Sequence, residues 1–140
     1  GNQENDKIKE YVYTDWNGTT GNSQRNYALT KITNPDALLY YLDDDNLLHP
    51  NIYNLLNIID NDKMYSFNQY NGLKGNIIRN GCIDSAMVII PYKLCKTEKW
   101  IINHYNADGY YIADCYNKTR NVHIFVDNDL CYYNKLQPEN

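Results

Sequence analysis

Four short apolar-rich segments lie between Cys82 and Cys131, and the four cysteines of the chain frame and punctuate them. The segments are residues 83–91, 99–106, 110–116 and 121–127. Each is rich in β-branched and aromatic residues and is bounded by Pro, Asn, Asp or Gly, a pattern typical of β-strands. This stretch therefore predicts a sheet of about four strands, around which the rest of the chain is organised.

Turn residues between these segments predict how the strands pair. Asp108-Gly109 suits the two-residue type I′ turn of a β-hairpin, and Lys118-Thr119 is expected at the tip of the next hairpin. Counting from these turns places Asn103, Asp114 and His123 in one row across three adjacent strands. One face of the resulting sheet is apolar, and the other mixes polar and aromatic side chains, as a correct register should produce.

Helix signals are clearest in two segments of the first half, residues 35–44 and 50–59. Asn34 can cap the first segment, and Pro35 suits its first position because the missing N–H would be unpaired there. Apolar residues of the second segment recur at i, i+3, i+4 and i+7: Ile52, Leu55, Leu56 and Ile59. We expect this stripe to pack on the apolar sheet face, which carries Trp100, Ile102, Ile124 and Val126.

The remaining segments give weaker patterns. Residues 17–26 are almost wholly polar and predict a loop, whereas residues 63–70 alternate enough to predict a strand. Together the patterns predict an α+β fold, with N-terminal helices packed on one face of a C-terminal antiparallel β-meander of about four strands. We expect a single domain over residues 1–140, with 1–6 and 134–140 as loose tails.

Charge and hydropathy exclude two classes of partner. The formal net charge is -4, the calculated pI is near 5.2, and there is no run of Lys and Arg, which argues against nucleic acid. No apolar run approaches the roughly 20 residues that a transmembrane helix needs, so we expect no transmembrane segment.

The cysteine pattern indicates an oxidising compartment. The four cysteines include no C-x-x-C pair, and His is too scattered for a zinc site, so disulfides in a secreted or periplasmic protein are expected. The predicted strand geometry favours the pairs Cys95–Cys115 and Cys82–Cys131; buried reduced thiols are the alternative. The chain starts at Gly1 without a signal-peptide pattern, so its targeting segment is expected to have been removed.

The predicted row of Asn103, Asp114 and His123 is the main candidate for chemistry. A carboxylate that orients an imidazole can make a general base, but it needs a nucleophile or a water to act on. The candidate nucleophiles are Ser66, Ser85 and Cys95, and nothing in the sequence brings them to His123. The simpler interpretation is an exposed cross-strand ion pair.

Other catalytic and metal patterns are incomplete. Cys82 or Cys95 could serve as a protease nucleophile, but no local signature surrounds either. Residues 104–115 resemble part of an EF-hand loop, yet His104 and Cys115 occupy positions that require carboxylates. We therefore predict no metal and no cofactor.

Function is predicted from the mixed sheet face. Tyrosine combines apolar area with a hydrogen-bonding tip, so an aromatic face is suited to binding. The leading hypothesis is an exported binding or interaction module that presents Tyr105, Tyr116, His123 and Phe125 to a protein or glycan partner. The alternative is a small hydrolase that uses Asp114 and His123, and a third candidate is a structural subunit without a small-molecule site.

Overall fold

The computed structural model describes residues 8–15 and 17–133 of the 140-residue chain. In chain order its elements are α1 (Asn22–Leu29), β1 (Leu38–Leu39), β2 (Leu47–Leu48), α2 (Ile52–Leu56), β3 (Met64–Gln69), η1 (Ser85–Met87), β4 (Val88–Pro91), α3 (Tyr92–Cys95), α4 (Ala107–Thr119), η2 (Arg120–Val122) and β5 (His123–Tyr132). The η elements are single turns of 3-10 helix. Within the described ranges, no helix is both long and apolar enough to cross a membrane.

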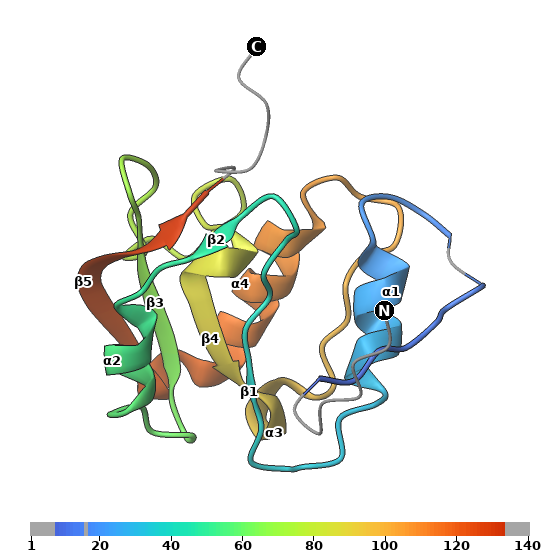
Figure 1. The fold of residues 1–140 in the computed structure, drawn as a ribbon, viewed down its shortest axis with the longest axis horizontal. Coiled ribbons are helices and arrows are strands. Elements are labelled where there is room, and N and C mark those ends of the chain that lie inside the picture. Colours follow the sequence, from blue (N-terminus) through green and yellow to red (C-terminus); the bar gives the residue numbers. More distant parts are fainter. Residues whose placement is uncertain (1–7, 16, 134–140) are drawn as a thin grey trace.

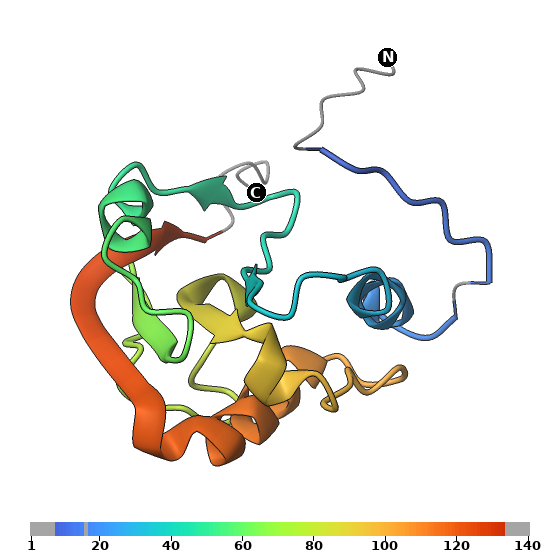
Figure 2. The same cartoon turned by 90° about the horizontal axis from the view of Figure 1, so that it is seen from below.

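The five strands form one sheet in the order β1-β4-β3-β5-β2, curled into a half-barrel (Figures 1 and 2). β3 and β5 pair in parallel, whereas the other neighbouring strands are antiparallel. Parallel neighbours need a long crossover, which here contains β4, α3 and α4. The α+β class is confirmed, but the predicted meander covered by N-terminal helices on one face is wrong.

The hydrophobic core gathers around the central strand β3. All six of its residues are buried, including the polar Ser66, Asn68 and Gln69, because neighbouring elements cover both of its faces. β4 is also buried along its length, and α4 adds Tyr111 and Ile112 to the same core. The strand predicted over 63–70 is confirmed.

The segment 110–116, predicted as a strand, lies inside helix α4. Buried residues of α4 recur at helical spacing: Ala107, Tyr111, Ile112, Cys115 and Thr119. Asp108 stands in the first turn, where a carboxylate interacts favourably with the helix dipole. The Asp108-Gly109 pair therefore begins a helix instead of forming a hairpin turn, and the predicted strand register is lost with it.

The helix predicted over 35–44 is also wrong. The Asn34 side chain accepts a hydrogen bond from the Asp36 N–H at 2.9 Å, and Ala37 N–H donates to the Asn34 carbonyl at 3.2 Å, which makes a turn. The chain then continues as β1, which pairs with β4. Asn-Pro can begin a helix or a turn, and the pairing with β4 decides between them.

The second predicted helix exists, but it is short and its apolar stripe is only partly buried. Ile52 and Leu55 are buried in α2, whereas Leu56 is 43% exposed and Ile59 lies beyond the helix, packed partly against the core. The prediction that all four residues pack on a common sheet face is therefore wrong.

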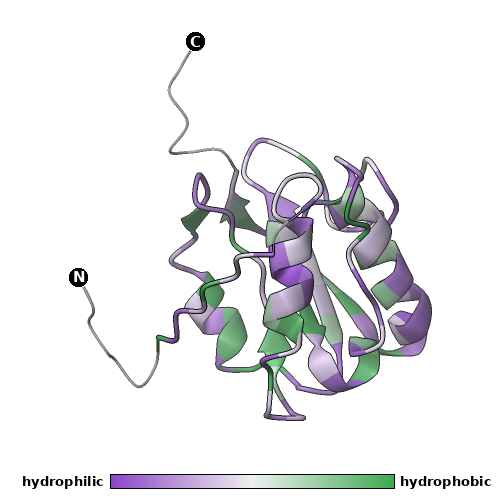
Figure 3. Cartoon of the chain, turned by 90° about the vertical axis from the view of Figure 1, so that its right-hand side faces the viewer, coloured by the Kyte–Doolittle hydropathy of each residue, from purple (hydrophilic) through white to green (hydrophobic). Residues whose placement is uncertain are grey.

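Helix α1 begins inside the segment that was predicted as a loop. Figure 3 shows this helix, at the front of that view, mostly in hydrophilic colours, and two of its three buried residues, Asn22 and Ser23, are polar; the third is Leu29. Asn22 Nδ2 donates to the carbonyls of Ile101 and His104, both at 3.0 Å. Amide side chains thus take the place of an apolar stripe, which is why hydrophobic periodicity missed this helix.

The segment 99–106 runs beside α1 as an irregular chain, not as the predicted strand (Figure 1). Asn26 holds it like a strand partner: Nδ2 donates to the Trp100 carbonyl and Oδ1 accepts from the Trp100 N–H, both at 2.8 Å. These bonds satisfy backbone groups that would otherwise need a neighbouring strand.

Candidate functional site

A polar cleft of about 810 Å³ lies beside the start of α1. Its walls come from the start of α1, the acidic loop 43–45, the segment 80–85 before β4, and the segment from Trp100 to the first turn of α4, and Gln69, Leu73 and Tyr133 complete the lining. Six separate parts of the chain thus contribute, and only tertiary folding brings them together. Its size falls in the range of small-molecule sites, roughly 300–1,000 Å³.

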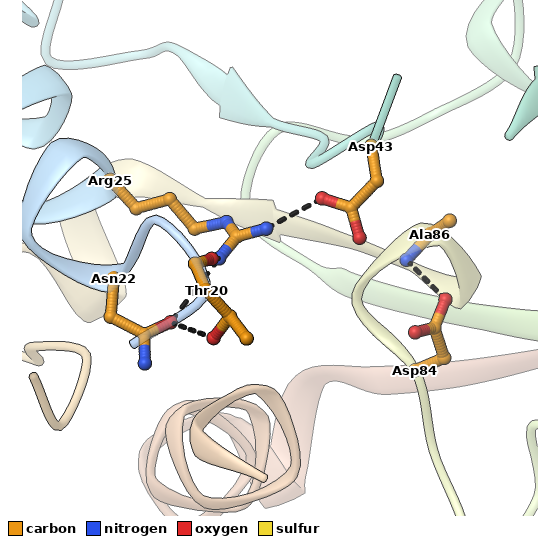
Figure 4. A network of polar contacts seen from close by, with 6 residues as sticks. All are labelled: Thr20, Asn22, Arg25, Asp43, Asp84 and Ala86. Carbon is orange, nitrogen blue, oxygen red and sulfur yellow. Dashed lines mark hydrogen bonds and ion pairs between the residues drawn. The ribbon is translucent and has the colours of Figure 1, made fainter. Parts of the chain in front are cut away.

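Arg25 of α1 connects two walls of the cleft (Figure 4). Its guanidinium donates to the Thr20 carbonyl at 2.7 Å and to Asn22 Oδ1 at 3.2 Å, and forms an ion pair with Asp43. The same guanidinium lies over the Trp100 ring, 4.7 Å from the centroid. Hydrogen bonds, a carboxylate and an aromatic face together compensate the charge of Arg25. Its ion pair with Asp43 also fixes α1 against the acidic loop.

Thr20, whose carbonyl accepts the hydrogen bond from Arg25, has an unusual backbone conformation. Its φ is 55°, in the left-handed region, which is rare for a β-branched residue. Backbone strain of this kind costs on the order of 1–3 kcal/mol and often occurs at functional sites.

Asp84 lies opposite Asp43 in the cleft, with its carboxylate accepting a hydrogen bond from the Ala86 N–H at 3.1 Å (Figure 4). Burial raises the pKa of Asp84 to about 6, the Ala86 N–H opposes this, and the neighbouring carboxylates of Asp108 and Asp43 reinforce it. The carboxyl group therefore exchanges protons near neutral pH, unlike an ordinary surface aspartate.

Asp108, in the first turn of α4, is a second perturbed carboxyl group in the cleft. Burial raises its pKa, the Gly109 N–H and Arg25 lower it, and Asp43 raises it further. Asp43, Asp84 and Asp108 come from three separate parts of the chain, and Asp43 lies close enough to raise the pKa of the other two carboxyl groups. Crowding of like charges favours protonation or a bound positive charge.

Aromatic residues form both the floor and the rim of the cleft. Trp100 is 2% exposed and stacks on Tyr111 at 4.7 Å with Arg25 over its ring, so it is a structural floor. Burial raises the pKa of Tyr111, whose hydroxyl lies 3.0 Å from that of Tyr41. Tyr105 on the rim is 78% exposed and free to contact a ligand.

The structure does not bring the predicted catalytic row together. Asp114 is an exposed residue of α4, Asn103 lies in the irregular segment before that helix, and His123 begins β5. Within the ranges that the structure describes, no ion pair or hydrogen bond joins Asp114 to His123. The row depended on a hairpin that the chain does not form.

His123 instead contacts Ser66, with 2.8 Å between Nε2 and Oγ. The Ser66 hydroxyl also donates to the Gly75 carbonyl at 2.6 Å, and it has one proton, so Nε2 must be the donor to Ser66. Burial lowers the pKa of His123, and Ser66 is fully buried. This pair therefore resembles a structural contact between β3 and β5 more than an activated serine.

Residues of the predicted aromatic face are divided between two places. Tyr116 of α4 and His123 are neighbours, with ring centroids 5.2 Å apart, and Phe125 follows on β5. Tyr105 alone lines the cleft. Tyr116 and Phe125 are half-buried, so they offer less contact area than the sequence suggested.

All four cysteines are free, contrary to the expected disulfides. Cys95 and Cys115 are nevertheless neighbours in the core, where Cys95 Sγ lies 3.9 Å from the Cys115 carbonyl oxygen. Hydrogen bonding to Cys95 and burial raise the pKa of the Cys115 thiol.

Among the described residues, no group of His, Cys, Asp and Glu is arranged to hold a metal ion.

Sequence reasoning did not identify Arg25, Asp43, Asp84 and Asp108 as residues of a site. A signal existed only for Asp108, which begins a helical pattern. The others carry no local motif, because their meeting point depends on long-range packing.

No protein-family model, curated protein or solved structure matches this chain, so a functional assignment depends on the geometry of the site.

Proposed function

We propose that the protein is a small binding module whose ligand site is the polar cleft, not the sheet face around His123. The observation that carries the proposal is the cleft itself: about 810 Å³, with walls held in place by the Arg25 network. Ligand sites are concave and largely preformed, with a few polar groups that fix orientation. The ligand is a small molecule or a side chain of a partner protein.

Geometry around His123 gives less support to the hydrolase alternative. A general base must reach the proton that it removes, whereas His123 donates to Ser66 and has no carboxylate partner among the described residues. Export of the protein, inferred from its cysteines, stays a prediction.

The test uses Tyr105, the exposed aromatic residue on the rim. Tyr105→Ala should weaken binding of any cleft ligand by about tenfold, since an exposed ring that contacts a ligand can contribute roughly 1–2 kcal/mol. Stability should change little, because the side chain is 78% exposed. The measurement is a thermal-shift screen of sugars, organic cations and organic anions, followed by NMR titration of the hits.

Tyr53→Ala is the matched control, because Tyr53 is 61% exposed on α2 and does not line the cleft. Binding that is unaffected by Tyr105→Ala, or that perturbs NMR signals of Tyr116, His123 and Phe125 instead, would contradict the proposal. Turnover of a screened compound that His123→Ala abolishes would favour the hydrolase.

A further inference from the structure

The side chains that line the cleft carry more negative than positive charge. Arg25 is the one Lys or Arg side chain among the described lining residues, which include five carboxyl groups: Asp43, Asp44, Asp45, Asp84 and Asp108. Arg25 is already bound to Asp43, Thr20 and Asn22, so its charge is not available to a ligand. An anionic ligand would therefore be repelled, and a neutral one would leave the carboxylates uncompensated.

We infer that the cleft binds an organic cation with several N–H donors, such as an amine or guanidinium compound; this inference rests on the proposed function of the cleft. The Arg25 guanidinium shows that this environment accommodates such a group: a carboxylate, a backbone carbonyl, an amide oxygen and an indole face surround it. Tyr105 and the remaining carboxyl groups offer the same chemistry to a ligand from outside.

Asn80 supplies a second, independent observation. Its Oδ1 atom is buried and accepts no hydrogen bond from the part of the chain that the structure describes. Asn80 lines the cleft and packs against Gly109 at the first turn of α4. Its uncompensated carbonyl dipole adds negative potential to this wall, which a cation in the cleft would offset. Trp100 Nε1, which is also buried without a hydrogen-bond partner among the described residues, belongs to the ring that the Arg25 guanidinium already covers.

Asp84 links cation binding to proton release. The groups that surround it come from four elements or their flanks: Asp43 of the acidic loop, Asp108 of α4, Cys131 of β5 and Tyr40 after β1. None of these provides a positive charge, so the empty site retains a proton on Asp84 below about pH 6. A bound cation stabilises the carboxylate, and the proton leaves to solvent as the cation enters.

The experiment is isothermal titration calorimetry of the whole chain with agmatine and spermidine as cationic probes. Glucose, succinate and Ca²⁺ serve as neutral, anionic and metal-ion comparisons. We expect both organic cations to bind at pH 7.5 and to bind about tenfold more weakly at pH 5.0, where Asp84 is protonated. Below pH 6, the heat of binding should depend on the ionisation enthalpy of the buffer, because binding releases a proton.

Asp84→Asn and Asp108→Asn should each weaken the binding of agmatine by about tenfold, and Asp84→Asn should remove most of the pH dependence. Asp36→Asn is the control, since it removes the same charge outside the cleft. Circular dichroism confirms that each variant is folded, and the wild-type pH comparison needs no variant.

Two results would overturn the inference: unchanged agmatine affinity in Asp84→Asn, or preference for glucose, succinate or Ca²⁺ over the organic cations. Binding of glucose that depends on Tyr105 would leave the proposed cleft function intact while rejecting the cation. Binding of no probe would reject the cation assignment directly.

Discussion

Asp84 shows how one side chain acquires unusual chemistry from its surroundings. Burial disfavours the charged form of its carboxyl group, and the neighbouring carboxylates of Asp108 and Asp43 add to this effect. The hydrogen bond from the Ala86 N–H compensates only part of this cost. The folded chain therefore holds a proton that the unfolded chain would release, and its stability depends on pH.

The pKa of Asp84 rises from 3.8 to about 6 on folding, so its contribution to stability is full below pH 4 and is lost as pH rises through 6. Asp84→Asn, which keeps the acceptor for Ala86, should stabilise the protein at pH 7 by about 1–2 kcal/mol. At pH 4 the two proteins should be equally stable. Urea unfolding at both pH values measures the difference, and equal stability at pH 7 would show that the carboxyl group is not perturbed.

Helix α1 shows that an element can be held by amides instead of apolar side chains. Asn22 and Asn26 bind the backbone of 100–104 and so position both Arg25 and the Trp100 floor of the cleft. The helix has little apolar burial of its own beyond Leu29. Its stability therefore depends on these polar contacts.

Asn26→Ala should destabilise the protein by about 1–3 kcal/mol, because it leaves both backbone groups of Trp100 without their partner. Asn54→Ala, at an exposed position of α2, is the control and should have almost no effect. Thermal unfolding of the two variants tests this. A loss confined to Asn54→Ala, or none in either variant, would contradict the anchoring role of Asn26.

At the scale of the whole molecule, a parallel pair at the centre of a mixed sheet distinguishes this fold from the predicted meander. β3 and β5 are distant in sequence, and the crossover between them contains the segments 80–85 and 100–108, which line the cleft together with the start of α1. The cleft is thus a consequence of the topology. The same packing buries Cys95, Cys115 and Cys131 as thiols, and burial raises the pKa of Cys131 to about 12.

Thiol labelling should therefore distinguish Cys82 from the other three cysteines. In the native protein only Cys82, which is half-exposed, should react rapidly with a thiol reagent, since the others are buried. In denaturant without reductant all four should react. Mass spectrometry counts the labels, and fewer than four in denaturant would show a disulfide and restore the predicted pairing.

Several parts of the fold followed from sequence patterns alone. The strand at 63–70, the short helix after Pro50 and the α+β class were predictable because each depends on local periodicity or a local start signal. The strand over 121–127 was predicted as well, although its partner was not. Of the site, Tyr105 was the one cleft residue identified in advance as a binding residue.

Sequence patterns alone were enough to predict an apolar-rich set of segments between residues 63 and 131 and a net negative charge. Tertiary structure decided the rest, for physical reasons visible in particular residues. Asp108-Gly109 is compatible with a hairpin or a helix start, and burial of Tyr111, Ile112 and Cys115 selects the helix. Arg25, Asp43 and Asp84 are far apart in the chain, so their shared cleft arises only when α1 and the crossover pack together, because electrostatic coupling depends on distance in space.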